Sequence, residues 1–245
     1  MKKLISFGGS GKIGSYCIKN WLNDNLIEKV WNFDLKKITS KNLVSIEKNV
    51  LEKNGYEKLK EILNDEKPNY FIIFAGYDFP QINNKNNYLS PYEPNLEIIN
   101  KAWEINCGIS YLVLKAIEEC NLSNISMTLI GSIYGDKLPN ASLYSDNSDM
   151  YKPVVYGMCK SALEYLNKQA SIHLAKRGGR CNLVRFGGVD IGINNSFRIR
   201  YSSISPSGKM VSLDSVLKTL TFMAFDDVSD LNGAIIDLDS GLRHK

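Results

Sequence analysis

The stretch from Lys3 to Ile18, KLISFGGSGKIGSYCI, constrains the fold more than any other part of the chain. A short apolar run, residues 4–7, leads into four glycines within seven positions, and a helical spacing of apolar residues follows. A strand, a glycine turn and a helix in this order form the first unit of a dinucleotide-binding fold. The helix N-terminus of such a unit attracts a pyrophosphate through its unpaired N–H groups and partial positive charge. The sequence therefore predicts an α/β fold that begins with a nucleotide site.

The glycine turn assigns roles to single residues. Gly8 permits the tight turn off the strand, Gly11 allows the backbone to approach a pyrophosphate, and Gly14 allows the helix to pack closely against the strand. The same loop contains further residues that we expect at the cofactor, namely Ser10, Lys12 and Ile13.

Asp34 follows a second strand-like run, residues 29–33, and stands 20 positions after Gly14. A carboxylate at this place accepts both hydroxyls of an adenosine ribose and repels a 2′-phosphate, which favours NAD. A solvated aspartate that opens a loop is the alternative, and the neighbouring Lys36 and Lys37 weaken the case against NADP. NAD is therefore the predicted cofactor, with NADP not excluded.

Length, charge and cysteine content fit an ordinary globular protein. The 245 residues are enough for one sizeable core. The net charge is +4, and the basic residues are spread along the chain without forming a block, so we expect neither a nucleic acid nor a membrane partner. Five cysteines without a C-x-x-C pair and only two histidines make a metal site unexpected. The amino-terminal apolar run is too short for a signal peptide, which makes the cytoplasm the expected location.

Strand and helix signals alternate along the whole chain. Further strands are predicted at residues 43–46, 69–74, 125–130, 181–186 and 234–238, and further helices at 55–63, 95–119, 156–176 and 213–224. This alternation predicts a doubly wound parallel sheet of about seven strands with helices on both faces, a Rossmann fold in one domain over residues 1–245. The polar stretches 77–94 and 136–152 are predicted loops without an assigned role, and residues 190–210 a mobile lid.

Tyr156 and Lys160 are four positions apart near the start of a predicted helix, so both project from one face. An ammonium beside a phenol favours the phenolate, which lowers the tyrosine pKa and allows proton exchange with an alcohol near neutral pH. Among 13 tyrosines roughly one such motif is expected by chance, and the chain also contains Tyr56–Lys60 and Tyr111–Lys115. Only Tyr156 follows a strand whose end carries a hydroxyl, that of Ser132, so this pair is the candidate.

Motifs in a characteristic order extend over nearly the whole chain. They are FGGSGKIG at 7–14, Asp34, FAG at 74–76, INCG at 105–108, GSIYG at 131–135, YGMCK at 156–160, VRFGGV at 184–189 and NGAIIDLDSG at 232–241. In this order and spacing they resemble the short-chain dehydrogenase/reductase family. The chain departs from the family pattern at Lys12, which replaces a glycine, and at Phe74, which replaces an asparagine.

The resemblance implies a set of site residues. Tyr156 corresponds to the catalytic acid/base, Ser132 to the hydroxyl that positions the substrate oxygen, and Lys160 to the residue that binds the nicotinamide ribose. Asn106 corresponds to a helix asparagine whose irregular backbone holds a water in a proton relay. The other implied cofactor contacts are Asn49 and Val50 at the adenine, Ala75 and Gly76 at a ribose, and Val189, together with Tyr156 and Lys160.

The sequence thus favours an NAD-dependent oxidoreductase acting on a polar alcohol or ketone, because GSIYG and the polar insert after it resemble enzymes that modify bacterial surface sugars and flagellin. The substrate would be a sugar or nucleotide sugar. A 3-oxoacyl-carrier reductase, which expects NADPH, and a non-catalytic NAD-sensing or scaffold protein are the alternatives. The helices at 95–119 and 156–176 resemble the family's four-helix subunit interface, so a homodimer or homotetramer is expected.

Overall fold

The computed structural model describes residues 2–78, 90–143 and 152–245. Within them a parallel sheet contains β1 (Lys3–Phe7), β2 (Lys29–Phe33), β3 (Leu43–Ile46), β4 (Tyr70–Ile73), β5 (Ser126–Ser132), β6 (Arg180–Phe186) and β7 (Ile235–Leu238). The strand order is β3-β2-β1-β4-β5-β6-β7, so the chain moves outward from β1 to β3 and then crosses back to β4. The predicted doubly wound Rossmann sheet is confirmed.

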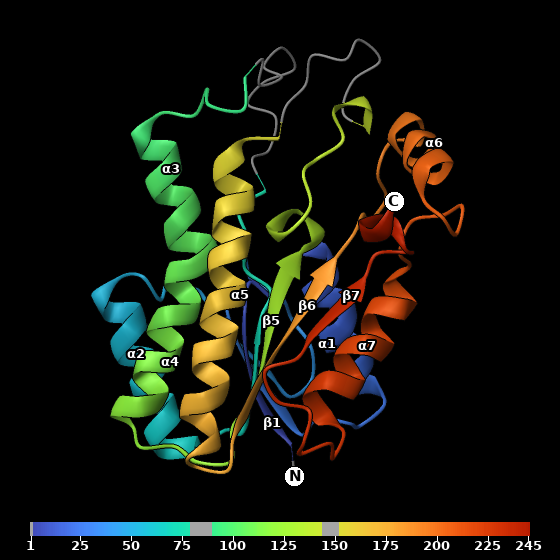
Figure 1. The fold of residues 1–245 in the computed structure, drawn as a ribbon. Helices are drawn as coiled ribbons and strands as arrows, with labels where there is room; N and C mark the ends of the chain where they lie inside the picture. The colour runs from blue at the N-terminus through green and yellow to red at the C-terminus, as the bar shows by residue number, and fades with distance from the viewer. Residues whose placement is uncertain (1, 79–89, 144–151) are drawn as a thin grey trace.

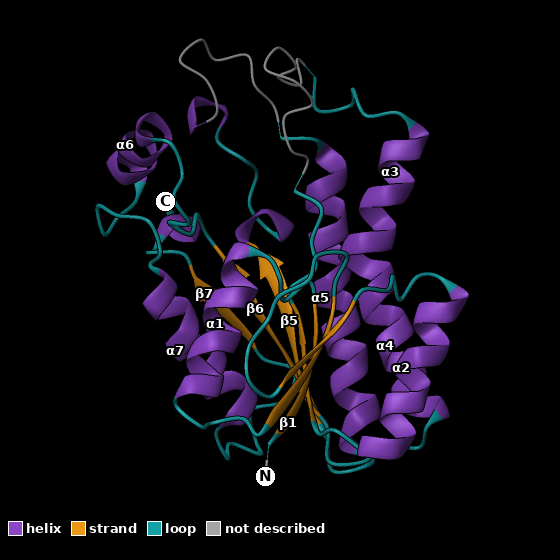
Figure 2. Cartoon of the chain, turned by 180° about the vertical axis from the view of Figure 1, so that it is seen from behind, coloured by secondary structure: helices purple, strands orange, loops and turns teal. Residues whose placement is uncertain are grey.

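Helices cover both faces of this sheet (Figures 1 and 2). One face carries α1 (Lys12–Asn23) and α7 (Leu213–Phe225), and the other carries α2 (Lys53–Glu66), α4 (Ile109–Glu119) and α5 (Val154–Ala175). Two hydrophobic cores follow from this arrangement, one beneath each helical layer. In β1, for example, Ile5 and Phe7 belong to the α2, α4 and α5 side, whereas Leu4 belongs to the α1 and α7 side. Strands buried on both faces explain the continuous apolar runs in the sequence.

The helix predicted at 95–119 is interrupted. It consists of α3 (Leu96–Trp103), one π-helical turn η1 (Glu104–Gly108) and then α4. A π-helical turn contains one residue more than an α-helical turn, so it shifts the backbone hydrogen-bond register at this point. The irregularity that the family resemblance implied at Asn106 is therefore present.

Residues 190–210, predicted from the sequence to be a mobile lid, contain a regular element that the sequence pattern did not indicate. They contain α6 (Asn195–Ile204), which begins where the side chain of Asn194 accepts a hydrogen bond from Phe197 N at 2.8 Å. Phe197, Tyr201 and Ile204 form one apolar face packed on a small cluster above the sheet. The sequence did not predict this helix, because its apolar face is only three residues long, too short for a clear period; the mobile lid remains a prediction.

The carboxyl ends of β1 and β4 meet where the strand order reverses. In open α/β sheets, ligands bind in the crevice at such a switch point. The two predicted loops, residues 77–94 and 136–152, are described only in part, because residues 79–89 and 144–151 lie outside the described residues.

Candidate functional site

The glycine loop turns sharply at the end of β1. Gly8 has a φ of 75°, and a Cβ there would lie 2.6 Å from Ala75 N, so loop and β4 end are in direct contact. A Cβ at Gly14 would lie 2.6 Å from Gly9 Cα, so the close approach that Gly14 allows is to the loop that follows β1, whereas the sequence analysis placed it at the strand. For a Cβ at Gly11 the nearest heavy atom would be Gly8 O at 3.4 Å, so the space around Gly11 is open.

A buried asparagine on β2 supports this loop from below. The Oδ1 atom of Asn32 accepts hydrogen bonds from Ser6 Oγ at 2.9 Å and Gly9 N at 3.0 Å, and its Nδ2 donates to Ser10 Oγ at 3.0 Å. Asn32 is fully buried. The sequence analysis missed it, although a single amide within the apolar run KVWNF was the signal.

Asp34 lies beside the same loop, at the end of β2. Its Oδ2 accepts a hydrogen bond from Ser10 N at 2.9 Å, and its Oδ1 accepts one from Lys36 N at 2.9 Å. Each carboxylate oxygen can accept a further hydrogen bond, so the side chain shapes the loop and still has capacity for ribose hydroxyls. The structure therefore places Asp34 where the sequence predicted it.

A cavity of about 780 Å³ opens at this switch point. Of the predicted cofactor residues, the ones that line it are Gly8, Ser10, Gly11, Asp34, Asn49, Val50, Ala75 and Gly76. Asn49 also stabilises its own turn, because its Oδ1 accepts a hydrogen bond from Leu51 N at 3.1 Å.

The remaining predicted cofactor residues lie outside this cavity. Lys12 starts α1, and its Nζ donates to Ile191 O at 2.9 Å, which joins the glycine loop to the segment before α6. Ile13 packs against the core between α1 and α7. Val189 is buried and pairs with Val211 in an isolated parallel bridge, which closes the base of the α6 segment.

The four predicted catalytic residues come from three elements and meet at the carboxyl end of the sheet. Ser132 ends β5, Tyr156 and Lys160 lie on α5, and Asn106 lies in η1. A Cβ at Gly76 would lie 3.5 Å from Asn106 Oδ1 and 3.7 Å from Lys160 Nζ, so this glycine leaves room where the groups converge.

Hydrogen bonds hold the buried members of this group. Lys160 Nζ donates to Ile130 O at 3.1 Å and lies 5.6 Å from the centre of the Tyr156 ring. Asn106 Nδ2 donates to Ala102 O at 2.9 Å and to Tyr77 O at 3.2 Å, while its Oδ1 accepts from Tyr77 N at 3.2 Å. Asn106 thereby ties the π-helical turn to the segment after β4.

The protonation of Tyr156 differs from the prediction. Desolvation raises the pKa of its phenol well above the ordinary value, and the charge of Asp78 adds to this, while a hydrogen bond with Ser132 acts in the opposite direction. Burial also lowers the pKa of Lys160 to about 8, so its ammonium is itself disfavoured. In the cofactor-free chain the lysine therefore does not make the tyrosine acidic, as the sequence analysis expected.

A second cation that the sequence analysis missed lies over the same ring. Lys152 Nζ is 4.5 Å from the centre of the Tyr156 ring and forms an ion pair with Asp78. The Lys152 side chain is 11% exposed, whereas that of Asp78 is 76% exposed. The reaction centre is therefore bordered by charge on this side.

The two other Y-x-x-x-K pairs are surface features. Tyr56 donates a hydrogen bond to Glu119 Oε2 at 3.1 Å, next to Lys60 and Lys115. Tyr111 is 61% exposed on α4. The described residues also contain no group of three or more His, Cys, Asp or Glu side chains that could hold a metal ion.

Comparison with known families gives a match to most of the chain. A family model described as enoyl-(acyl carrier protein) reductase matches residues 84–243. A curated protein of Caenorhabditis elegans, a probable 2,4-dienoyl-CoA reductase, is 30% identical over 94 residues. That match covers 35% of this chain and spans 30% of the relative's length.

Solved structures resemble the chain over its full length. A short-chain dehydrogenase of Leptospira borgpetersenii with bound NAD⁺ has a TM-score of 0.83 at 20% identity, covering 99% of this chain and 92% of the other. Ligand-free aldohexose dehydrogenase of Thermoplasma acidophilum has a TM-score of 0.80 at 17% identity, covering 100% and 94%. At this level of identity the likeness shows the shared fold.

Proposed function

The chain belongs to the short-chain dehydrogenase/reductase family and is an oxidoreductase of that family, and we propose that it transfers a hydride between NAD and a polar alcohol or ketone. The substrate would be a sugar or nucleotide-sugar derivative used in surface-glycan or flagellin modification. The observation that carries the proposal is the convergence of Asn106, Ser132, Tyr156 and Lys160 beside a dinucleotide-sized cavity.

The residues at this end of the sheet fit a dinucleotide. No side chain of the described residues caps α1, so its first N–H groups and the open backbone at Gly11 remain available to a pyrophosphate. Asp34 would bind the adenosine ribose hydroxyls. Lys36 and Lys48 line the same cavity, which keeps NADP in view as a second cofactor. When bound, the nicotinamide takes the hydride from the alcohol carbon or gives it to the ketone carbon.

The chain's own residues would handle the proton. Ser132 holds the substrate oxygen, and Tyr156 takes its proton in oxidation or supplies one in reduction. A phenol whose pKa is raised stays protonated at neutral pH, which is the form that ketone reduction needs. Lys160 binds the nicotinamide ribose, and Asn106 holds a water that connects the site to solvent.

The polar substrate is supported by the surroundings of Tyr156. The Lys152–Asp78 ion pair borders the ring, and polar groups of this kind suit a substrate with several hydroxyls better than a long acyl chain. Residues 144–151, which belong to the polar insert after Ser132, lie outside the described residues.

A 3-oxoacyl-carrier reductase or a related thioester reductase is the second candidate. Both the description of the matching family model and the name of the curated relative point to acyl thioester substrates. A silent NAD-binding scaffold is less favoured, because all four predicted catalytic residues are present and lie at the same end of the sheet.

Binding and turnover assays separate these candidates. Quenching of protein fluorescence by NADH and NADPH measures cofactor preference, and turnover is then tested on UDP-sugars, free sugars and acetoacetyl-CoA. We expect NADH to bind more tightly and a sugar compound to react. Reaction of acetoacetyl-CoA with NADPH alone would replace our proposal by the second candidate, and binding without any turnover would support the scaffold.

We also propose that two or four copies associate through α4 and α5. The outward side of these helices exposes Tyr111, Tyr165 and Ile172, each more than half exposed, around an apolar groove of about 610 Å³. Large exposed apolar patches mark association sites in soluble proteins. Light scattering should give a dimer or tetramer for the parent and a smaller mass for Tyr165→Glu; a monomeric parent would contradict this.

We further propose that the 245 residues fold as one domain that works in the cytoplasm. The helices found in the described part of the chain are all too short or too polar to cross a membrane. Fractionation of cells that express the tagged protein tests the location.

A further inference from the structure

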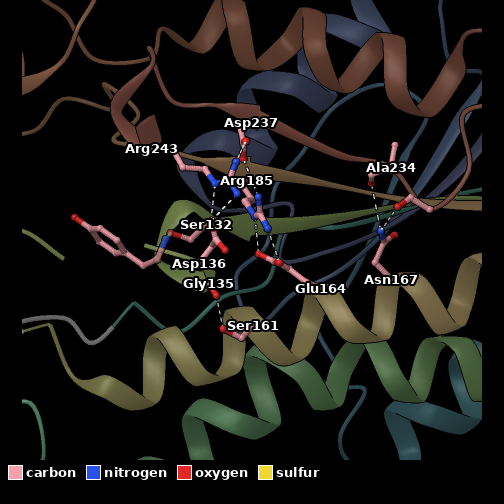
Figure 3. A network of polar contacts seen from close by, with 12 residues as sticks. Ser132, Gly135, Asp136, Ser161, Glu164, Asn167, Arg185, Ala234, Asp237 and Arg243 are labelled. Carbon is pink, nitrogen blue, oxygen red and sulfur yellow. Dashed lines mark hydrogen bonds and ion pairs between the residues drawn. The ribbon is translucent and has the colours of Figure 1, made fainter. Parts of the chain in front are cut away.

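The turn after Ser132, η2 (Ile133–Gly135), packs directly on the backbone of α5. A Cβ at Gly135 would lie 3.0 Å from the carbonyl carbon of Lys160, so only glycine allows this approach. The hydroxyl of Ser161 donates a hydrogen bond to the Gly135 carbonyl (Figure 3). Since α5 also carries Tyr156, the way the turn sits on this helix sets the position of Ser132 relative to Tyr156.

A buried ion pair lies under one end of the turn (Figure 3). Arg185 Nε and Nη2 donate to the two carboxylate oxygens of Glu164, each at 2.6 Å, and the side chains are only 9% and 13% exposed. A Cβ at Gly135 would be 2.7 Å from Glu164 Oε1, so the carboxylate touches the turn. Arg185 also pairs in the sheet with Gly131, the residue before Ser132.

The same arginine also connects, through two further residues, to Asp136, which directly follows Gly135. Arg185 Nη1 is 3.3 Å from Asp237 Oδ1 on β7, and Asp237 Oδ2 is 2.9 Å from Arg243 Nη1. Arg243 Nη2 is 2.6 Å from Asp136 Oδ2, and Asp136 is the residue at which the turn ends. We call the five residues Asp136, Glu164, Arg185, Asp237 and Arg243 the charge clamp.

The charge clamp fixes geometry more than it stabilises the fold. Burying charges costs desolvation that their mutual attraction only partly offsets, so a buried ion pair is weak evidence for stability. A bidentate arginine–carboxylate pair is strongly directional, however, and holds its partners in one orientation. Its members alternate in sign along this series of contacts, so each arginine lies between two carboxylates.

We propose that Arg185 is a positioning residue, which through the charge clamp keeps the turn on α5 and the hydroxyl of Ser132 against Tyr156. This role rests on the proposed function, because the Ser132–Tyr156 contact matters through proton transfer. Arg185 itself does not contact the reacting groups in the structure.

The contact can be measured without a substrate, by NMR of the full chain labelled with ¹³C at tyrosine Cζ. The Tyr156 resonance is assigned by its loss in Tyr156→Phe, and Ser132→Ala shows its position without the serine hydroxyl. The clamp is opened in the double variant Arg185→Met/Glu164→Gln, which removes both charges and leaves neither buried alone. Arg180→Met is the matched control, because Arg180 is a buried arginine of the same strand that binds carbonyls at the opposite end of the sheet.

In the double variant we expect the Tyr156 resonance to move to its position in Ser132→Ala, and in Arg180→Met to stay at the parental position. An unchanged resonance in the double variant, or an equal shift in Arg180→Met, would overturn the proposal. If the double variant fails to fold, Arg243→Met opens the clamp at its exposed end and should give a smaller shift in the same direction; no shift there would also overturn it. Failure of the parent to bind NADH would refute the proposed function, while the resonance would still decide the role of Arg185.

Discussion

The glycine loop and the turn after Ser132 both cross the carboxyl end of the sheet, yet they are held in opposite ways. Beneath the glycine loop lies a neutral amide, Asn32, whose partners are hydroxyls and one backbone N–H. Around the turn lies the charge clamp, with Arg185 at its centre. Asp34 also holds the glycine loop, through Ser10 N, but it does so from the edge of the loop. The side chain buried beneath the loop is neutral and does not oppose the helix dipole that attracts an anion, whereas a turn that must not move benefits from directional charged pairs.

The largest expected effect comes from Tyr156→Phe, which should abolish proton transfer beside the turn and leave cofactor binding at the glycine loop unchanged. The ring keeps its edge-to-face contact with Tyr134, but the group that transfers the proton is deleted. With a substrate from the assay panel, kcat should fall by about 10²–10⁴-fold while NADH affinity is unchanged. Tyr111→Phe is the control, since it belongs to a Y-x-x-x-K pair on the surface. Near-normal turnover in Tyr156→Phe would remove this residue from the reaction.

A second test measures how the free energy of unfolding depends on pH through the buried Lys160. Burial lowers the pKa of Lys160 from 10.5 to about 8, so between these values the unfolded chain binds more protons than the folded one. The free energy of unfolding should therefore rise with pH in this window, by about 3 kcal/mol over the whole shift at roughly 1.4 kcal/mol per pKa unit.

Denaturant titrations from pH 7 to 10, in the cofactor-free parent and in Lys160→Met, measure this effect. Cys17 and Cys181, whose pKa values are raised by burial alone, contribute equally to both proteins and cancel in the difference. Cys107 and Cys159 interact with the Lys160 charge, so both are replaced by serine in the two proteins compared. If the difference in unfolding free energy between the parent and Lys160→Met does not change with pH, the pKa of Lys160 is not lowered by burial.

The neutral support of the glycine loop can be broken with Asn32→Ala. This change leaves the Ser6 hydroxyl and Gly9 N–H buried without their acceptor, which should cost about 1–3 kcal/mol of unfolding free energy and weaken NADH binding several-fold. Asn182→Ala is the matched control, because Asn182 is an equally buried strand asparagine that binds the Leu231 carbonyl far from the loop. It should destabilise the protein without changing NADH affinity; equal affinity losses in both variants would contradict a specific role for Asn32.

The smallest effect on the free energy of unfolding is expected from Asp34→Ala, at the edge of the loop. Loss of the ribose acceptor should weaken NADH binding by about tenfold and improve NADPH binding, because the negative charge is gone. Lys36→Met tests whether this lysine attracts the 2′-phosphate of NADPH, and we expect it to weaken the binding of NADPH but not of NADH. Equal NADH affinity in Asp34→Ala and the parent would count against this assignment.

Local patterns in the sequence predicted the fold and the positions of the expected catalytic residues. The positions of Gly8 at the turn and Asp34 beside it were predictable because strand, turn and acidic residue follow one another in the chain. Asn32 and Arg185 were missed, because each acts across neighbouring strands and its partners are set by the sheet register. The pKa of Tyr156 was predicted in the wrong direction, because the spacing to Lys160 shows the charge but not the desolvation that opposes it.

The π-helical turn at Glu104–Gly108 has a consequence for how this protein can change over time. Deleting one residue there would restore a regular helix, but would rotate everything on one side of the deletion by about 100° relative to the other. Either Asn106 would turn away from Tyr77, or Val113 and Ala116 would leave the core of the sheet. No single deletion gives a working intermediate, so an inserted residue of this kind persists in descendants even if the site that first favoured it changes its chemistry.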